Sequence, residues 1–288
     1  MLFLTAAAFA QENLGARPMG MGGAFAGLAD DINAIFINPA GISSLQKESL
    51  MVSTRVSEGR EYSMMGGVEV IPAGNIGIGY VGSNDPIAYS SLDGESPVKY
   101  TTQTLYLTFS KDLNRTLRVS KNMGTLLVGM NVKLSSRKLA MANGLYKDAG
   151  SNMDIDLASI FRPNDSISLG LSLQNFINGS KYSKIANLNT VEERGFAVLA
   201  GVSGRLFEDR VTWTAEGDEL GCEIQPIKGL TLRAGRGKDS VTSGIGINLN
   251  GLCIDYAYLQ KDSPVHYWSI SIIPNDTPAV KTASLNLE

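Results

Sequence analysis

Few residues of this chain are of the types that carry out catalysis or bind metals. There is one histidine, His266, and there are two cysteines, Cys222 and Cys253. Strand alternation puts His266 and Cys222 on an outer face and Cys253 on an inner face. No sequence feature indicates which Ser and Asp would complete a catalytic triad with His266. A histidine-based metal site is also unsupported, because the chain has no second histidine. We therefore expect no catalytic residue, no metal, no cofactor and no disulfide.

Two glycine-rich stretches resemble nucleotide-binding motifs in sequence but lack the structural context that such sites need. Residues 77–82 fit G-x-G-x-x-G, but a dinucleotide site needs a helix directly afterwards. The Ser-Asn-Asp-Pro sequence at 83–86 predicts a turn instead. In the stretch 235–238 the first glycine is wrongly spaced for a phosphate loop, and Asp239 replaces the Ser or Thr that would hold magnesium. We interpret the first as a strand and the second as a loop tip.

Composition excludes further classes. Charged residues make up 18% of the 288 residues and the net charge is −3, so no basic face for nucleic acid is expected. No run of 18 apolar residues is present, which excludes a transmembrane helix. The acidic pairs Glu192-Glu193 and Asp218-Glu219 fall in predicted loops or strand ends, where solvated faces are the first interpretation and calcium binding is the alternative.

The first ten residues, MLFLTAAAFA, form an apolar run that ends in an A-x-A sequence. This is the pattern of a signal-peptide core and cleavage site without its basic start. We expect residues 1–10 to be a truncated signal peptide, removed before Gln11. A short buried helix is the alternative.

From residue 48 onward, apolar residues recur at every second position, as in strands with one apolar face. In the stretch 125–135, Leu126, Val128 and Met130 share one face, and Gly129 and Asn131 share the other. We count fourteen such segments, at 48–56, 61–70, 76–82, 100–110, 124–138, 151–162, 167–177, 194–206, 210–217, 220–226, 230–236, 242–250, 251–260 and 264–273.

The connections between these segments alternate in length. Tight turns at 72–75, 163–165, 207–209, 228–229 and 250–251 carry Gly, Asn, Asp or Pro. Most of the intervening connections are longer, although the stretch 111–123 is long and basic on the tight side. Short turns on one side and long loops on the other are typical of outer-membrane barrels. The fold expected is all-β, a single antiparallel transmembrane β-barrel of about 14 strands; a soluble β-sandwich or propeller is the alternative.

The segment 15–45, GARPMGMGGAFAGLADDINAIFINPAGISSL, resembles the amino-terminal plug of FadL-type outer-membrane β-barrels, and its wording is closest to the PorV/PorQ branch. The resemblance implies a bacterial outer-membrane protein with a plug at 11–47 and a barrel at 48–273. Residues 274–288 depart from the family pattern, and we expect a periplasmic tail there, either disordered or in contact with a partner. The plug residues that carry the resemblance are Gly20, Gly22, Gly23, Asp30, Asp31, Asn38, Pro39, Ala40 and Gly41.

If the apolar face of the strands meets lipid, the other face lines the lumen. That phase places charges of both signs inside, where water or partners compensate them. The lumen candidates are Arg55, Glu69, Lys133, Asp154, Asp156, Glu216, Glu223, Arg233 and Asp255. Asp30, Asp31 and Asn33 are expected to pair with lumenal Arg55, Lys133 or Arg233.

Two functional hypotheses follow from the resemblance. The first is plug-gated passive transport of small hydrophobic molecules. The mixed charges of the lumen count against it, because a path for hydrophobic molecules is expected to be apolar. The second is a PorV-like role in type IX secretion or surface attachment, acting through a periplasmic or secreted protein partner. Both place the barrel in outer-membrane lipid. An enzyme is disfavoured, because no nucleophile and base constellation is present.

Overall fold

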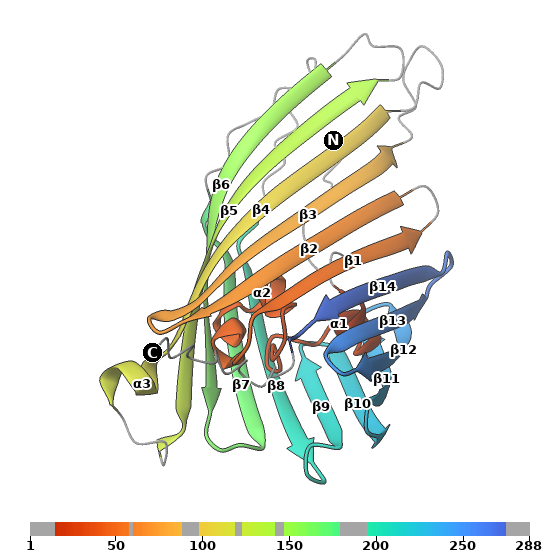
Figure 1. The fold of residues 1–288 in the computed structure, drawn as a ribbon. Helices are drawn as coiled ribbons and strands as arrows, with labels where there is room; N and C mark the ends of the chain where they lie inside the picture. The colour runs from red at the N-terminus through yellow and green to blue at the C-terminus, as the bar shows by residue number, and fades with distance from the viewer. Residues whose placement is uncertain are drawn as a thin grey trace, which may run out of the picture.

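The computed structural model describes residues 15–57, 60–87, 98–118, 123–141, 147–178 and 195–274. The expected signal peptide and nearly all of the expected tail lie outside this range. Fourteen strands of the described chain form one closed antiparallel barrel, in which each strand pairs with its sequence neighbours and β1 pairs with β14 (Figure 1). The strands are β1 Ser49–Ser57, β2 Arg60–Ile71, β3 Gly74–Ile87, β4 Val98–Asp112, β5 Thr125–Met141, β6 Lys147–Arg162, β7 Ile167–Asn178, β8 Ala197–Leu206, β9 Val211–Glu216, β10 Glu219–Ile227, β11 Leu230–Gly237, β12 Ser240–Leu249, β13 Leu252–Gln260 and β14 Val265–Ile272.

Each of the fourteen predicted segments corresponds to one strand, and the largest differences lie in β3 to β6. Here the ladder continues past the apolar pattern, for example where Pro86 pairs with Lys99. Most of the residues added to β3 and β4 are polar or charged, and those added to β5 and β6 do not alternate between apolar and polar, so the pattern no longer marks them. The wall is consequently tall on the β2–β6 side and low on the β8–β14 side (Figure 1). We call the end where the chain enters β1 the near mouth, and the other end the far mouth.

The outer face of the wall is apolar and the inner face is polar or small. Along β1 the side chains alternate between exposed and buried; Leu50 and Val52 are 63% and 60% exposed, whereas Met51 and Ser53 are buried. The same alternation brings Ile76, Ile78, Leu107, Phe109, Leu169 and Leu171 to the outside. A continuous apolar exterior of this size is unfavourable in water and suits lipid, and closure leaves no unpaired strand edge.

Glu69 corrects one of the predicted lumen positions. Its side chain is exposed and shares the outer face with Met65, whereas Met64 and Val68 point inward and are buried. The pair Gly66-Gly67 lies between these residues and has no side chains that would indicate which face is which. The sequence pattern therefore predicts the inward and outward faces of β2 in the wrong order. Glu69 lies close to the β2–β3 turn, at the rim where an outward charge can reach water.

Residues 15–47 run inside the barrel, and we call them the lumenal segment. It contains α1 (Ala16–Gly20), α2 (Ala34–Ile37) and the 3₁₀ helix η2 (Pro39–Ser44). α1 packs against β11 to β14, while α2 and η2 pack against β3 to β6 (Figure 1). Most of the fully buried apolar side chains of the barrel belong to this segment, including Met21, Phe25, Leu28, Ile35 and Ile42.

A further helix, α3 (Leu113–Leu117), lies in the connection between β4 and β5 at the near mouth. Among the described residues, no helix combines the length and the apolar character needed to cross a membrane.

Candidate functional site

The candidate site is the lumen, where two halves of the lumenal segment are held in different ways. The first half, residues 15–33, meets the low wall through hydrogen bonds to polar side chains. Ser269 Oγ accepts the amide N–H of Ala16 at 2.8 Å, and Glu216 Oε2 accepts the amide N–H groups of Phe25 and Ala26 at 3.1 and 2.8 Å. Thr242 Oγ1 accepts the amide N–H of Gly22 at 3.0 Å. The wall thus satisfies backbone groups that the irregular segment leaves unpaired.

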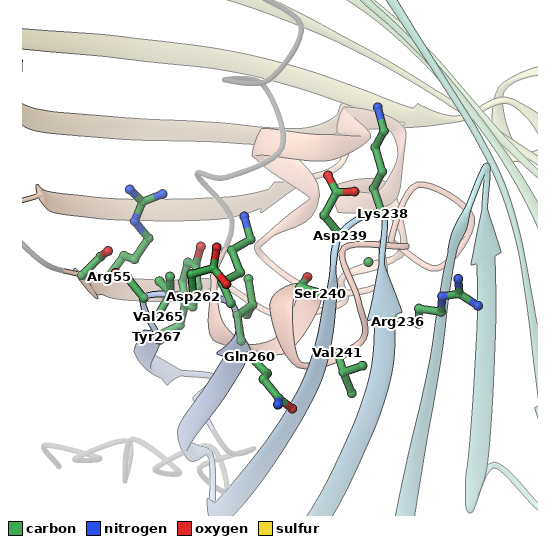
Figure 2. Close-up of a pocket in the computed structure, with 15 residues that line it drawn as sticks. Arg55, Arg236, Lys238, Asp239, Ser240, Val241, Gln260, Asp262, Val265 and Tyr267 are labelled. Atoms are coloured by element: carbon green, nitrogen blue, oxygen red, sulfur yellow. The ribbon is translucent and has the colours of Figure 1, made fainter.

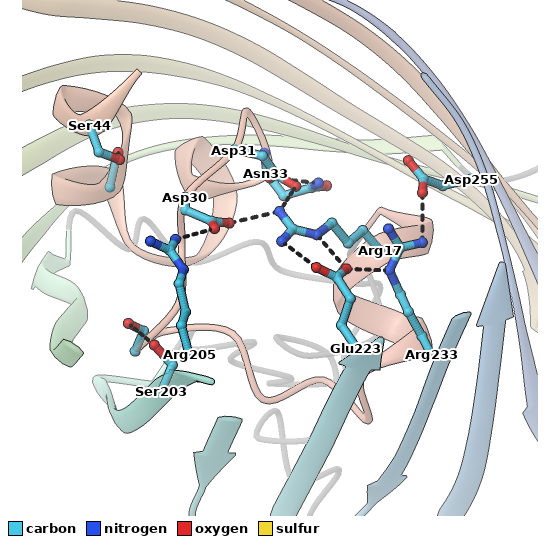
Figure 3. Close-up of polar contacts among 12 residues, drawn as sticks. Arg17, Asp30, Asp31, Asn33, Ser44, Ser203, Arg205, Glu223, Arg233 and Asp255 are labelled. Atoms are coloured by element: carbon cyan, nitrogen blue, oxygen red, sulfur yellow. Dashed lines mark hydrogen bonds and ion pairs between the residues drawn. The ribbon is translucent and has the colours of Figure 1, made fainter. Parts of the chain in front are cut away.

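Arg17 is the centre of a buried ion-pair network between this half and the wall (Figure 3). Its Nη1 lies 2.7 Å from Asp30 Oδ1 and 2.8 Å from Asp31 Oδ2. Its Nε and Nη2 form a bidentate pair with Glu223 of β10, both at 3.0 Å. A planar guanidinium suits such a fork, and the geometry fixes α1 relative to both the following turn and the wall.

The network continues along the wall. Glu223 Oε2 also accepts Arg233 Nε at 2.6 Å, and Arg233 Nη1 donates to Asp255 Oδ1 at 2.6 Å. On the other side, Arg205 Nη2 lies 2.8 Å from Asp30 Oδ2 (Figure 3). Three cations and four anions from the lumenal segment and strands β8, β10, β11 and β13 therefore compensate one another away from bulk water.

The two adjacent aspartates differ in acidity. Burial favours the protonated form of Asp30, but Arg17 and Arg205 outweigh it and lower the pKa of this carboxyl. Burial also acts on Asp31, which pairs with Arg17 alone and lies next to the Asp30 charge, so the pKa of Asp31 is raised. Asp31 therefore takes up a proton at a higher pH than Asp30 does.

The second half, residues 34–47, is held by neutral contacts to the tall wall. Asn38 organises its turn: Nδ2 donates to the carbonyls of Ala26 at 2.9 Å and Ser159 at 3.3 Å, and Oδ1 accepts the Ala40 amide. Ser110 Oγ donates to the Ala40 carbonyl at 2.8 Å. Further amide side chains of the wall donate to carbonyls of this half, as Asn75 Nδ2 does to Leu45 at 2.9 Å, and Phe36 packs edge-to-face on Tyr106.

Glycines let the backbone of the lumenal segment approach the wall. A methyl group added at Gly129 of β5 would overlap the backbone of Ala40, and one at Gly170 of β7 would overlap that of Ala26. Within the segment, Gly22 and Gly23 adopt φ values of +75° and +93°, which only glycine takes without strain. The segment thus fits the wall backbone to backbone.

A second polar cluster lies where β7 bulges. Lys133 Nζ lies 2.7 Å from Asp156 Oδ1 and donates to Asn175 Oδ1, and the Asn175 backbone has φ +55°. The register between β6 and β7 shifts at this point. Asn131 Nδ2 donates both to Asp156 Oδ2 and to the Ile35 carbonyl, which connects the cluster to the lumenal segment.

A cavity of about 1040 Å³ occupies the far mouth above the lumenal segment (Figure 2). Its sides are the end of β1 and the β11–β12 and β13–β14 hairpins. Charged and polar side chains, among them Arg55, Lys238 and Asp262, share the lining with apolar ones such as Leu259 and Tyr267. Arg55 itself lies over the ring of Tyr62, 3.7 Å from its centroid.

The structure brings most of the predicted residues together in the lumen. All nine predicted plug residues belong to the lumenal segment, and the side chains of Arg55, Lys133, Asp154, Asp156, Arg233 and Asp255 lie on the inner face. The expected partners of the acidic pair were wrong. Asp30 pairs with Arg17 and Arg205, while Lys133 pairs with Asp156 and Arg233 pairs with Glu223 and Asp255.

Sequence reasoning placed Glu223 in the lumen but missed Arg17 and Arg205. The available signal for Arg17 was a single cation in a glycine-rich apolar stretch, thirteen and fourteen positions before the two aspartates of the acidic pair.

No protein-family model and no curated protein sequence matches this chain. Solved structures do match it, at low sequence identity. The toluene transporter TbuX of Ralstonia pickettii superposes with a TM-score of 0.65 at 11% identity, over 92% of this chain and 99% of that one. The fold is that of the FadL-type barrels.

Two further structures agree. The toluene transporter TodX of P. putida gives a TM-score of 0.61 at 13% identity, over 92% of this chain and 99% of that one. A FadL homologue of Pseudomonas aeruginosa gives 0.53 at 11% identity, over 90% and 97%. At these identities the likeness concerns the fold.

Proposed function

We propose that this protein is a channel of the bacterial outer membrane through which small hydrophobic molecules pass passively, and that residues 11–47 are its plug. The apolar exterior of a closed barrel supports the membrane location. The structural neighbours include proteins described as toluene transporters and as a monoaromatic hydrocarbon channel. Residues 48–273 form the barrel, and the signal peptide 1–10 and the periplasmic tail 274–288 belong to the same proposal.

The orientation follows from the connections. At the near mouth, where β1 starts, every connection except β4–β5 is short. The far mouth also has short turns, but it carries the long connections 88–97 and 179–196. In outer-membrane barrels the short turns face the periplasm. The near mouth is therefore the periplasmic one, and the far mouth with its cavity opens to the outside.

One observation carries the proposal: the lumenal segment lies across the lumen beneath an open cavity. A ligand can collect at the far mouth, but the segment occupies the path below it. Residues 34–45 are held by neutral hydrogen bonds and apolar packing, whereas the first half contributes three members to a network of seven charged groups. We assign the movable part of the plug to residues 34–47, because all the ion pairs of Arg17 lie outside them.

The charged lumen favours small and compact ligands over extended apolar ones. Lys133, Arg233 and Asp156 are all paired, so they present hydrogen-bonded, largely compensated surfaces rather than bare charges. Leu259, Val265 and Tyr267 line the cavity but are buried, so the apolar surface that they present is small and suits a compact hydrocarbon. Such a ligand leaves the ion pairs intact.

The test is uptake into liposomes that contain the purified barrel. We expect faster entry of toluene-sized apolar tracers than in protein-free vesicles, and no entry of a polar solute of similar size. A matched variant, Leu259→Lys, places a charge on the cavity lining and is expected to slow apolar entry. Uptake equal to that of protein-free vesicles would contradict transport and favour a plugged scaffold with a PorV-like role, to be sought through copurifying protein partners.

A further inference from the structure

The connection between β4 and β5 differs from the tight turns at the same mouth. It carries α3, which stands outside the ring of strands (Figure 1). None of the described residues of α3 lines the cavity.

α3 is fixed to the barrel by its own polar residues. Asp112 accepts the amide N–H groups of Asn114 and Arg115, at 2.9 and 3.3 Å, which caps the first turn. Asn114 is buried; its Nδ2 donates to the Gly124 carbonyl and its Oδ1 accepts the Leu126 amide, both at 2.7 Å. The helix is therefore a rigid extension of the wall.

The outward surface of this extension is both apolar and basic. Leu117 and Met123 are 66% and 74% exposed. Arg115 and Arg118 are exposed beside Leu117, and within the described part of the chain Arg115 forms one ion pair, with Asp112 at 3.3 Å. This mixture of bare apolar side chains and cations is costly in water and typical of segments that lie at a membrane interface.

The position of α3 matches that surface. β4 ends at Asp112, three residues after the outward-facing Phe109, and β5 begins next to the outward-facing Leu126. The apolar band of the wall therefore reaches the base of α3. Under the orientation proposed above, this level is the periplasmic leaflet of the membrane.

We propose that α3 is an interfacial membrane anchor that binds anionic phospholipid. Leu117 and Met123 enter the periplasmic leaflet, and Arg115 and Arg118 contact lipid phosphate groups. Lys111, at the end of β4, adds a third cation on the same connection. The inference rests on the membrane location in the proposed function, and it is independent of transport.

The first test measures the depth of α3 with one tryptophan. Trp213 and Trp268 are replaced by phenylalanine, and Leu117→Trp is the reporter in vesicles of phosphatidylcholine and phosphatidylglycerol. Matched reporters are Leu107→Trp on the lipid-facing wall and Asp165→Trp on the exposed β6–β7 turn. We expect brominated lipid to quench Leu117→Trp, and iodide to quench it less than Asp165→Trp.

Two results would overturn the anchor in distinguishable ways. If iodide quenches Leu117→Trp as strongly as Asp165→Trp while lipid still quenches Leu107→Trp, the barrel is in the membrane and α3 is not. If lipid quenches none of the reporters, the membrane location fails, and the anchor fails with it. Heat-dependent mobility in electrophoresis verifies that each variant is folded.

The second test addresses the phosphate contacts. Arg115→Glu with Arg118→Glu is compared with Arg210→Glu with Lys228→Glu, which makes the same charge change on other near-mouth turns. Each cation near a lipid surface is worth about a fivefold preference for anionic lipid. We expect bound phosphatidylglycerol, counted by native mass spectrometry, to fall by at least that factor only in the α3 variant. Equal losses in both variants would overturn specific binding by α3.

Discussion

Arg17 holds the first half of the lumenal segment, because its guanidinium contacts Asp30, Asp31 and Glu223 at once. Arg17→Met removes these pairs and leaves three carboxylates with one partner fewer. Removing one member of a buried pair costs on the order of 3–5 kcal/mol. We expect amide hydrogen exchange in α1 to become faster by several hundredfold.

Arg210→Met is the matched control, since this arginine is exposed on the β8–β9 turn. Its exchange pattern in α1 is expected to equal that of the unchanged protein. Unaltered exchange in Arg17→Met would show that packing alone holds the segment.

The two aspartates give opposite pH dependences. The lowered pKa of Asp30 means that its stabilising contribution is complete above its ordinary pKa and is lost as the pH falls through the lowered value. The raised pKa of Asp31 means that the fold favours its protonated form, so its contribution is complete at low pH and is lost as the pH rises through its ordinary and then its raised value.

At neutral pH we therefore expect Asp30→Asn to weaken α1 protection more than Asp31→Asn does. The difference is expected to shrink on acidification, once Asp30 is protonated in the unchanged protein too. Hydrogen exchange of α1 between about pH 2 and pH 7 measures both effects, because the lowered pKa of Asp30 lies below the ordinary value of a carboxyl. Equal effects of the two substitutions at every pH would refute this assignment of roles.

Sequence patterns predict which face of a strand a residue lies on more easily than they predict which residue it pairs with. Alternation located Lys133, Arg233 and Asp255 on the inner face, because every second residue of a strand faces the same way. It could not tell that Asp30 meets Arg17 and Arg205, since this depends on where an irregular segment crosses the lumen. Arg233 meets Glu223 because the two residues lie opposite one another on β11 and β10. Glu69 shows the limit even for alternation, because two adjacent glycines erase the phase.

At the scale of elements, the fit between the lumenal segment and the wall depends on glycine. Gly129→Ala would push against the backbone of Ala40, and overpacking of this kind costs about 1–3 kcal/mol. We expect the second half of the segment to loosen and the ion current through the barrel to rise. Single-channel recording measures this change.

Gly195→Ala is the control, since an added methyl group there has no neighbour within 4 Å. Its current is expected to match that of the unchanged protein. A Gly129→Ala protein that is folded and carries no added current would argue against residues 34–47 as the movable part.

The strands themselves were predictable because apolar alternation and turn residues mark them along the whole wall. Their far ends in β3 to β6 were not, because the ladder continues there through residues that do not alternate between apolar and polar, as at Asn84 and Asp85. α3 also escaped prediction. The stretch 111–123 stood out only as long and basic, and the helix depends on local bonds made by Asp112 and Asn114.

At the scale of the whole molecule, the wall of the barrel has an apolar outer surface and a charged inner surface. Its exterior is apolar and continuous, and its lumen compensates buried charges with partners from the lumenal segment. A fourteen-strand barrel is too wide for wall side chains alone to fill. The lumenal segment supplies the missing interior, so its removal is expected to leave the wall closed and the lumen open.

The most direct test of this account is single-channel conductance of the intact protein and of a variant lacking residues 11–45, both in planar bilayers. We predict that the intact protein conducts little and that the deletion variant, folded as judged by heat-dependent mobility, opens a large and steady pore. A folded deletion variant with the same low conductance as the intact protein would contradict the plug and the gated path built on it.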